Sequence, residues 1–505
     1  MSDSAMARRG GAVDPRLPVL IGVGQVTQRV DRGDDALEPV DLMAEALRRA
    51  EHDAGRGGIL AGADSIRVIN ELSWRYLDPG ALVAQRIGAT PRTTEYTVMG
   101  GNYVQTVVNR TALDIQSGRN DLVLLTGGEA WRTRTQAKKA GADLGWTTQS
   151  PGTPPPIQIG DDHDLVHPVE LSRGVFLPVQ VYPMFDIALR AEQGLSITEH
   201  RRQLAELWAR FSEVAADNPY AWIQRSYTAE EIATPSPDNR MIGFPYTKLM
   251  NSNNNVEQGA GLILCSVERA RALGVAPDRW VFIHAGADAH DHWFLSNRAD
   301  LHSSPAIRIA GRAALDLAGV TIDDVAHVDL YSCFPSAVQV AARELGLSLR
   351  RQLTVTGGMS FAGGPWNNYV MHAIATMAGV LRDDPGSLGL CTANGGYVTK
   401  HAFGIYSTEP PPSGRFRHAE PQDEVDALPS RELAEDHEGE VAIETYTVMH
   451  DRDGRPERAL AACLTADGRR AWGATTDPAA MHALIAEDLV GAKAVLSAAG
   501  NLELA

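Results

Sequence analysis

Two series of buried-strand and amphipathic-helix patterns alternate along this chain, and this alternation limits the folds available to it. The stretch LPVLIGVG at residues 17–24 is continuously apolar and ends in glycine, as a buried strand does. Residues 38–55 then carry apolar side chains at helical spacing, and strand and helix patterns continue to alternate up to residue 130. Such an alternation predicts an α/β fold with a mostly parallel sheet and helices on both faces.

A second series of similar length begins near residue 279. Its expected strands cover residues 279–287, 325–332, 352–358 and 388–396, with helical patterns between them, which suggests a duplication. Residues 131–240 break the rhythm with SPGTPPP, the acidic GDDHD and a long helical stretch, so we expect an inserted loop or lid domain. The predicted amino-terminal half therefore covers residues 1–275, and the predicted carboxy-terminal half covers residues 276–408.

The last part of the chain, residues 409–505, has a different pattern. A Pro/Gly/Ser-rich linker, STEPPPSGRFR, leads into an acidic stretch and then into alternating β-rich runs around the turns DRDGRP and ADGRR. These features predict a small antiparallel β domain, a barrel of the oligonucleotide/oligosaccharide-binding type. The acidic stretch argues against nucleic acid as its ligand.

Composition excludes several classes of function. A net charge of −17 argues against a phosphate-backbone partner and against electrostatic attachment to anionic lipid. The four cysteines form no CxxC or Cys/His run typical of zinc, and no apolar stretch approaches membrane-spanning length. The first residues, MSDSAMARRGGAVDPR, lack the apolar core of a signal peptide, so we expect a cytoplasmic protein with reduced thiols. GVGQVT is no dinucleotide fingerprint, because Thr27 stands at the third glycine position, and no required cofactor is expected.

Several glycine-rich stretches give a more specific indication. In order they are VMGGNYVQTVVNRTALDIQSGRNDLVLLTGGEAW, PYTKLMNSNNNVEQGAGLILCSVERARALG, VDLYSCFPSAVQ, VTGGMSFAGGPWNN and CTANGGYVTKHAFGIYS. Together they resemble the thiolase superfamily, especially its sterol-carrier-protein-like branch and the group called thiolase-like protein type 1, which carries an extra carboxy-terminal domain. The resemblance implies a duplicated, five-layered α/β/α/β/α fold with a loop domain inserted in the first half.

Thiolases make or break a carbon–carbon bond beside a thioester. In that family a cysteine at a helix amino terminus takes the acyl group, and the helix dipole and a neighbouring base lower its pKa. A histidine in a GHP loop activates the cysteine, a second cysteine in a CxG loop moves a proton, and an asparagine or histidine helps to bind the enolate oxygen.

This sequence departs from the family at each of these positions. The nucleophile corresponds to Gly101, or to Gly100 if the gap is placed one residue earlier. The GHP histidine is Gly364, the oxyanion-binding histidine is Tyr331, and the CxG cysteine falls near Ala393 or Asn394. Because glycine has no side chain that attacks a thioester, ordinary thiolase chemistry is not expected.

Parts of the binding cradle are expected to remain. The helix that begins near Gly101 keeps free N–H groups, and Gly395 and Gly396 can present N–H groups to a carbonyl oxygen. The resemblance places YTKLMNSNNN beside the coenzyme A channel, where Lys248 would face a phosphate; a solvated surface lysine is the alternative. The same resemblance implies amide contacts to the ligand from two more residues, Asn253 and Asn254.

Other side chains could replace the missing groups. Cys333 and Cys391 are candidates for a relocated nucleophile, although a small buried core residue is the simpler role for each. His401 borders the inferred cleft and is a candidate acid or base. Tyr331 can either donate a hydrogen bond to an oxyanion or fill the space that a substrate needs.

Three functions remain open from the sequence. We favour a thiolase-related protein that binds coenzyme A or acyl-CoA without thiolase activity. The alternatives are an acyl-CoA acyltransferase or C–C lyase with a relocated or non-covalent mechanism, and a subunit that completes a partner's active site. A protein partner could dock through the carboxy-terminal domain, and both a monomer and a dimer are compatible with the family.

Overall fold

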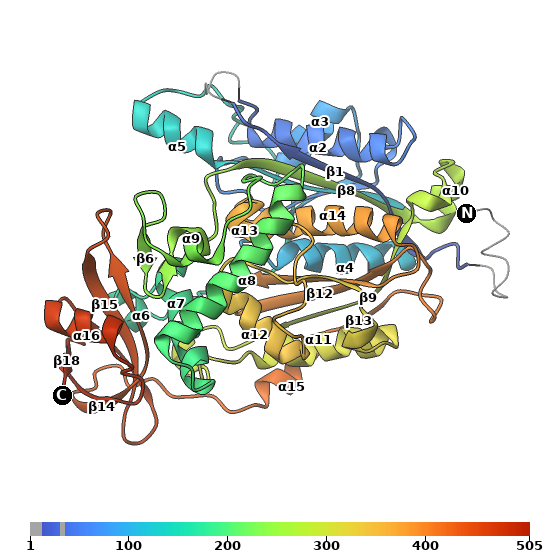
Figure 1. Ribbon diagram of the computed structural model, residues 1–505. Coiled ribbons are helices and arrows are strands. Elements are labelled where there is room, and N and C mark those ends of the chain that lie inside the picture. The colour runs from blue at the N-terminus through green and yellow to red at the C-terminus, as the bar shows by residue number, and fades with distance from the viewer. Residues whose placement is uncertain (1–12, 31–35) are drawn as a thin grey trace.

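The structure of the chain is a computed structural model that describes residues 13–30 and 36–505. Most of the amino-terminal stretch expected to lack a signal peptide, residues 1–12, lies outside the described residues. The described chain forms helix and sheet layers that follow one another as α/β/α/β/α, with a smaller sheet at one end (Figure 1). This arrangement is the fold that the resemblance implies.

The first sheet layer has the strand order β3-β2-β4-β8-β1. Only β8 runs antiparallel to its neighbours in this layer. The bounds of these strands are β1 (Pro18–Thr27), β2 (Ser65–Val68), β3 (Thr93–Thr97), β4 (Leu122–Ala130) and β8 (Glu257–Ser266). The central strands β4 and β8 are buried throughout because helices cover both faces.

The second sheet layer has the order β10-β11-β12-β9 and joins the first where β9 pairs with β1. Its strands are β9 (Val281–His290), β10 (His327–Asp329), β11 (Gly389–Gly395) and β12 (Lys400–Ser407). These strands correspond in order to β2-β4-β8-β1 of the first layer, and none of them corresponds to β3. The predicted strand at residues 352–358 is wrong: Leu353 accepts one backbone hydrogen bond from Leu330, but this segment forms no strand.

Six helices form the other three layers. The outer layers are α2 (Pro39–Asp53) with α3 (Pro79–Ile87), and α11 (Pro305–Ala318) with α12 (Pro335–Leu345). The layer between the sheets holds α4 (Tyr103–Gln116) and α14 (Tyr369–Asp383). Both middle helices pack against strands of both sheets, and their apolar side chains are buried accordingly. The amino terminus of α4 thus lies inside the molecule, where a functional site is expected.

The segment that interrupts the two series is mostly helical. Its elements are α5 (Trp131–Ala140), β5 (Ile157–Ile159), α6 (Pro168–Ser172), α7 (Pro178–Glu192), α8 (Ile197–Asp217), α9 (Ala229–Ala233), β6 (Met241–Gly243) and β7 (Tyr246–Thr247). A capping box of Ser196 and Glu199 begins α8 and satisfies backbone groups at its first turn. The α8 helix packs against the short helix α13 (Gly358–Phe361), which precedes Gly364.

The carboxy-terminal region forms the separate antiparallel sheet that the sequence predicts, in the order β16-β15-β14-β17-β18. The elements are β14 (Gly439–His450), β15 (Pro456–Leu464), β16 (Arg470–Thr475), α16 (Pro478–Ala486), β17 (Lys493–Leu496) and β18 (Leu502–Leu504). A bridge from Ala474 to Asn501 brings the end of β16 to the turn before β18. Closure into a barrel of the oligonucleotide/oligosaccharide-binding type stays a prediction.

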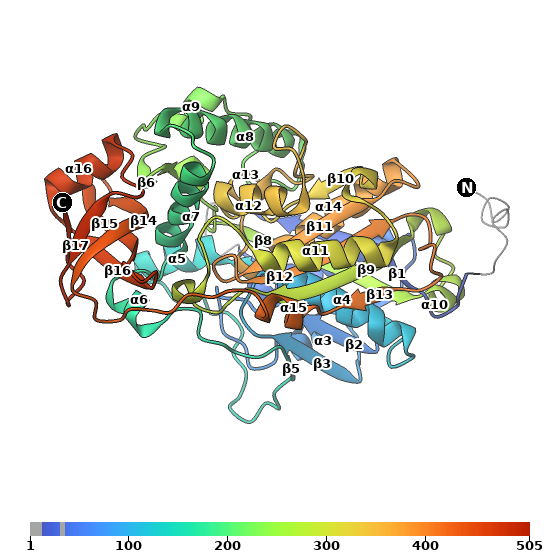
Figure 2. The ribbon, with the colours of Figure 1, turned by 90° about the horizontal axis from the view of Figure 1, so that it is seen from below.

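The segment that precedes this sheet packs along the second sheet layer. Part of it, β13 (Arg417–Ala419), pairs with β9, and α15 (Gln422–Asp426) follows. In the view from below, the carboxy-terminal sheet lies beside α6 and α7, at the end of the molecule opposite α10 (Val267–Ala272) (Figure 2).

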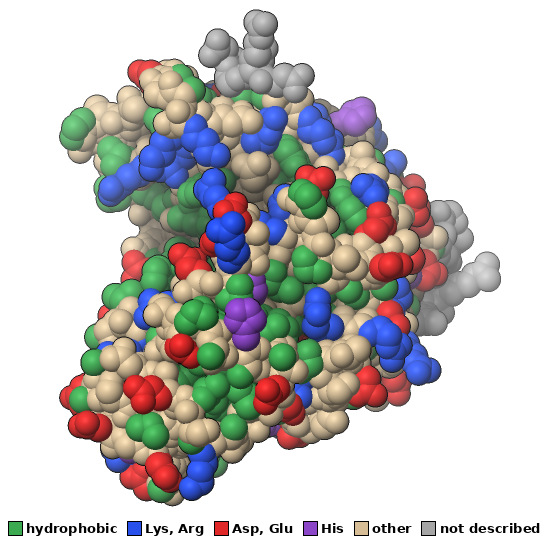
Figure 3. Space-filling view, turned by 60° about the vertical axis from the view of Figure 1, so that its left-hand side comes forward, with side chains coloured by type: hydrophobic (Ala, Val, Ile, Leu, Met, Phe, Trp, Pro, Cys, Tyr) green, Lys and Arg blue, Asp and Glu red, His purple; other side chains and the backbone are tan. Residues whose placement is uncertain are grey.

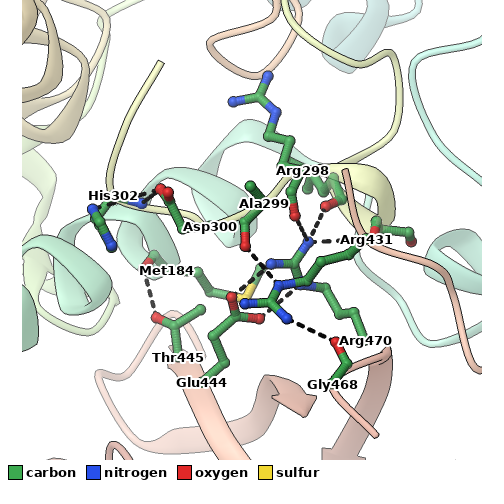
Figure 4. Close-up of polar contacts among 12 residues, drawn as sticks. Met184, Arg298, Ala299, Asp300, His302, Arg431, Glu444, Thr445, Gly468 and Arg470 are labelled. Carbon is green, nitrogen blue, oxygen red and sulfur yellow. Dashed lines mark hydrogen bonds and ion pairs between the residues drawn. The ribbon is translucent and has the colours of Figure 1, made fainter. Parts of the chain in front are cut away.

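A buried arginine connects the carboxy-terminal sheet to the main body through hydrogen bonds. Arg470 donates from Nη1 to the carbonyl oxygens of Leu295 and Arg298, each at 2.7 Å, and pairs with Glu444 of β14 (Figure 4). Nearby, Arg431 donates to the carbonyl oxygen of Ala299. These bonds fix the loop that follows β9, which in turn lies against the candidate site.

Candidate functional site

The amino terminus of α4, where the resemblance places a thiolase nucleophile, presents glycine backbone. Gly100 has a φ of +152°, in the region that favours glycine, and its N–H donates to Asn367 Oδ1 at 3.1 Å. Its carbonyl oxygen accepts from the N–H of Tyr103, the first residue of α4. At this point the chain offers backbone dipoles to the interior and no nucleophilic side chain of its own.

Tyr331 fills the space above Gly101. Its backbone N–H donates to Thr392 Oγ1 at 2.9 Å, and its ring packs edge-on against Tyr369 with 5.8 Å between centroids. A Cβ atom on Gly101 would stand less than 3.0 Å from the Tyr331 hydroxyl and 2.6 Å from the carbonyl oxygen of Asn394. Real Cβ atoms essentially never approach other atoms so closely, so the present packing leaves no room for a side chain at position 101.

The loop at Gly364 is filled in the same way. A Cβ atom on Gly364 would stand less than 3.0 Å from Ser252 Oγ and 3.0 Å from Asn254 Oδ1. The hydroxyl of Ser252 donates to Asn254 Oδ1 at 2.8 Å, and the Gly364 N–H donates to the Asn253 carbonyl oxygen at 2.9 Å. The structure therefore brings Asn253 and Asn254 to the loop where the resemblance places the GHP histidine, and they pack on it.

Asn394 connects this region to the inserted segment. Its Nδ2 donates to the hydroxyl of Tyr182 at 3.0 Å, and that hydroxyl donates to the carbonyl oxygen of Gly396, also at 3.0 Å. Asn394 Oδ1 is buried and has no hydrogen-bond partner among the described residues. Gly395 lies against Asn102 Oδ1. Donation to a ligand by the N–H groups of Gly395 and Gly396 stays a prediction.

A small cavity lies behind these residues. Its volume is about 10 Å³, and its wall includes Tyr331, Asn394, His401, Thr392 and Ile307. That volume corresponds to about one water molecule. An acetyl group does not fit there unless Tyr331 or a neighbour moves.

The two candidate replacement thiols are neutral core side chains. Cys333 lies after β10, close to Tyr182 and Asn394, and burial raises the pKa of its thiol to about 12. Cys391 lies on β11, opposite Gly404, and burial raises the pKa of its thiol well above the ordinary value. Since the thiolate is the nucleophile, neither cysteine is activated in this structure.

His401 is held by polar partners on the far side of the small cavity. Its Nε2 lies 3.6 Å from Asp291 Oδ2 and 3.4 Å from Ser304 Oγ, and Ser304 also donates to Asp291. Burial works against ionisation of Asp291, yet the nearby His401, the charge of Arg298 and the hydrogen bond from Ser304 hold its pKa below the ordinary value. His401 therefore contacts an ionised carboxylate, as an oriented histidine does.

The structure does not bring Lys248 to the site residues described above. It is exposed at the start of a short 3₁₀ turn, Lys248–Met250, and its backbone N–H donates to the carbonyl oxygen of Arg240. Within residues 13–30 and 36–505, no group of His, Cys, Asp or Glu side chains is placed to hold a metal ion. None of the helices in that part of the chain is long and apolar enough to cross a membrane.

The sequence interpretation missed three residues that shape the site: Lys400, Tyr182 and Ser252. The amine of Lys400 reaches the amino terminus of α4 and donates to the Met99 carbonyl oxygen at 2.8 Å. A signal for Lys400 existed, because this chain contains lysine at only five positions and one of them adjoins His401. Tyr182 and Ser252 come from the inserted segment and the loop after it, and no local pattern indicates their contacts.

Comparison with a solved structure decides the family. The monomeric SCP2-thiolase-like protein type 1 of Mycobacterium smegmatis is 34% identical, with a TM-score of 0.83, and the match covers 98% of this chain and 100% of that one. The chain belongs to the thiolase-like protein type 1 family. Two family profiles agree: residues 420–501 match the thiolase-like protein type 1 additional C-terminal domain, and residues 287–352 match a thiolase C-terminal domain-like family.

Two more distant proteins are similar to this chain, one in sequence and one in fold. An acetyl-CoA acetyltransferase of Methanothermobacter thermautotrophicus is 25% identical over 331 residues, which cover 64% of this chain and 75% of the relative. The Ltp2-ChsH2(DUF35) aldolase has a TM-score of 0.60 at 20% identity, covers 78% of this chain and 99% of its own, and shows the fold alone. The resemblance stated from the sequence is thus confirmed.

Proposed function

We propose that this thiolase-like protein binds thioesters of coenzyme A and does not carry out the thiolase reaction. The contact between Tyr331 and Gly101 is the observation that argues against a thiolase reaction. A thiol side chain has no room at position 101 as the site is packed, and the small cavity beyond it accommodates about one water molecule. Buried, neutral Cys333 and Cys391 supply no alternative thiolate.

Two features support coenzyme A as the ligand. The acetyl-CoA acetyltransferase relative is similar to this chain over 331 residues, 64% of its length. In addition, the space-filling view shows a hollow between two lobes, with Lys and Arg side chains gathered on the lobe that contains α5 (Figure 3). The basic residues of α5 are Arg132, Arg134, Lys138 and Lys139. In a protein of net charge −17, a local basic ridge beside a hollow suits the phosphates of coenzyme A.

Isothermal titration of the full chain with coenzyme A and with acetyl-CoA tests this proposal. We expect binding of one ligand per chain, weakened about tenfold by the double substitution Lys138→Ala and Lys139→Ala, and weakened also by Lys248→Ala if that lysine faces a phosphate. Lys493→Ala, at an exposed ion pair with Glu440 on the carboxy-terminal sheet, is the matched control and should bind normally. Absence of heat with both ligands would contradict the proposal.

A second candidate function is that of a subunit in a larger assembly. Three apolar side chains are exposed on α6 and on the loop between α6 and α7, beside the carboxy-terminal sheet: Leu171, Phe176 and Leu177. The segment is fixed in place, because Arg173 donates to the Ala498 carbonyl oxygen. A rigid, exposed apolar group is typical of a docking site. One structural neighbour is an aldolase named for two proteins, Ltp2 and ChsH2. A protein that copurifies with the wild-type chain, but not with a double variant carrying Leu171→Glu and Leu177→Glu, would favour this function.

A further inference from the structure

The amine of Lys400 lies in a largely buried position. Lys400 lies on β12 with 8% of its surface exposed, and its side chain extends over Gly100 to the amino terminus of α4. A Cβ atom on Gly100 would stand 2.7 Å from Lys400 Nζ, so a glycine is required there for the amine to approach the backbone. Of the two residues that align with a thiolase nucleophile, Gly101 thus faces a hydroxyl and Gly100 faces an amine.

The surroundings of this amine disfavour its charged form. Nζ donates to the Met99 carbonyl oxygen and lies 4.9 Å from the centroid of the Tyr103 ring, but among the described residues no carboxylate oxygen lies within 4.0 Å of it. Burial lowers the pKa of Lys400 to about 8, and attraction by Asp162 offsets part of that effect. The positive end of the α4 dipole lies beside it and acts in the same direction as burial.

A second group at the same place lacks a partner. Asn102 is more than nine-tenths buried, and its Oδ1 accepts no hydrogen bond within the part of the chain that the structure describes. This oxygen stands 2.5 Å from the position of a Cβ on Gly100, next to the Lys400 amine. An unsatisfied buried carbonyl oxygen is costly, and its persistence beside an amine indicates a site for a ligand that donates a hydrogen bond.

We propose that Lys400 is a nucleophilic amine that forms a Schiff base with a small aldehyde or ketone at the amino terminus of α4. The amine nitrogen attacks the carbonyl carbon to form a carbinolamine, whose hydroxyl donates to Asn102 Oδ1. Water then leaves, so that the C=O bond is replaced by a C=N bond and no oxidant or reductant is consumed. Met99, whose carbonyl oxygen accepts from the amine, is 50% exposed, so this side of the amine lies near the surface. This reaction does not depend on the proposed binding of coenzyme A.

Reductive trapping on the full chain tests the proposal. Acetaldehyde and cyanoborohydride convert a Schiff base into an N-ethyl-lysine, and mass spectrometry of peptides resolves the five lysines separately. At pH 7 a pKa of about 8 gives Lys400 a neutral fraction on the order of 100-fold larger than that of an ordinary lysine. Allowing for its burial, we expect Lys400 to be labelled at least about tenfold faster than exposed Lys493, with a rate that levels off above pH 8.

Two variants test whether the pKa of Lys400 determines its rate of labelling. Asn102→Asp places a carboxylate beside the amine, which should raise the pKa of Lys400 and slow its labelling at pH 7, while the control Asn255→Asp, on an exposed loop, should leave the rate unchanged. If Lys400 is labelled no faster than Lys493, or its rate still rises beyond pH 10, the lysine is only a structural contact and the proposal is wrong.

Discussion

The hydroxyl of Tyr331 occupies the space in which a side chain on Gly101 would begin. The two residues lie 230 positions apart in the sequence, on different halves of the fold, and the Tyr331 hydroxyl fits there because residue 101 has no side chain. Gly101 cannot be returned to the thiolase cysteine alone without disturbing the packing.

Restoring the nucleophile should destabilise the protein without creating a thiolase. Gly101→Cys forces its Cβ against Tyr331 and the Asn394 carbonyl oxygen, and overpacking of this kind costs about 1–3 kcal/mol. Denaturant unfolding of Gly101→Ala, Tyr331→Phe and the double variant measures the coupling. We expect Tyr331→Phe to recover part of the loss. Gly379→Ala, in the interior of α14 where a Cβ meets nothing within 4 Å, is the control and should be neutral or stabilising.

The GHP histidine should be equally hard to restore. Gly364→His collides with Ser252 Oγ, which is held by its hydrogen bond to Asn254. We expect a lower unfolding midpoint for this variant, and a partial recovery when Ser252→Gly is added to make space. An unchanged midpoint in the single variant would show that the loop moves freely, contrary to the packing described.

The buried ion pair at the carboxy-terminal sheet should be essential for its docking. Arg470→Ala leaves Glu444 without its partner and removes a donor from three carbonyl oxygens, of which only that of Leu295 keeps another donor, the Arg298 N–H; such a change typically costs about 3–5 kcal/mol. Hydrogen exchange should then increase in the loop at residues 295–300. The exposed pair of Lys493 and Glu440 supplies the control, since Lys493→Ala should leave both the stability and the exchange of that loop unchanged.

One buried histidine should make the protein sensitive to mild acid. His372 lies inside α14, its Nδ1 bonds to Gln25 Oε1 at 2.9 Å, and burial lowers its pKa to about 3. Between the unfolded value near 6.5 and 3, the unfolded state binds the proton and the folded state does not, so acidification through this range lowers stability.

His372→Asn keeps a donor toward Gln25 and removes this titration. Its free energy of unfolding should therefore fall less than that of the wild type between pH 6.5 and pH 4, by up to about 1.4 kcal/mol per pH unit. Exposed His482→Asn should behave as the wild type. Identical pH slopes for His372→Asn and the wild type would show that His372 titrates normally.

Much of the fold could be predicted because its signals are local. The helices at residues 103–116 and 369–383 follow from apolar spacing, and β4 and β8 follow from continuous apolar runs. The expected strand at residues 352–358 failed because its backbone is used differently: Thr354 and Thr356 bond to the buried Asp329 carboxylate, and their segment turns into α13.

The site could be predicted only in part. The absence of a side chain at Gly101 and Gly364 is visible in the sequence, but what fills each space is not. Tyr331 and Ser252 reach these glycines through contacts between distant segments, and the burial that makes Cys333 and Cys391 poor nucleophiles is a property of the folded chain. Lys400 is recognisable as a candidate nucleophile only from the structure, in which its side chain on β12 lies over Gly100.

Intact-protein mass spectrometry after incubation with acetyl-CoA shows whether this site can hold an acyl group on sulfur. We expect an unchanged mass for the wild type and for Tyr331→Phe. A hydroxylamine-sensitive acetyl adduct that disappears in Cys333→Ala or in Cys391→Ala would contradict it.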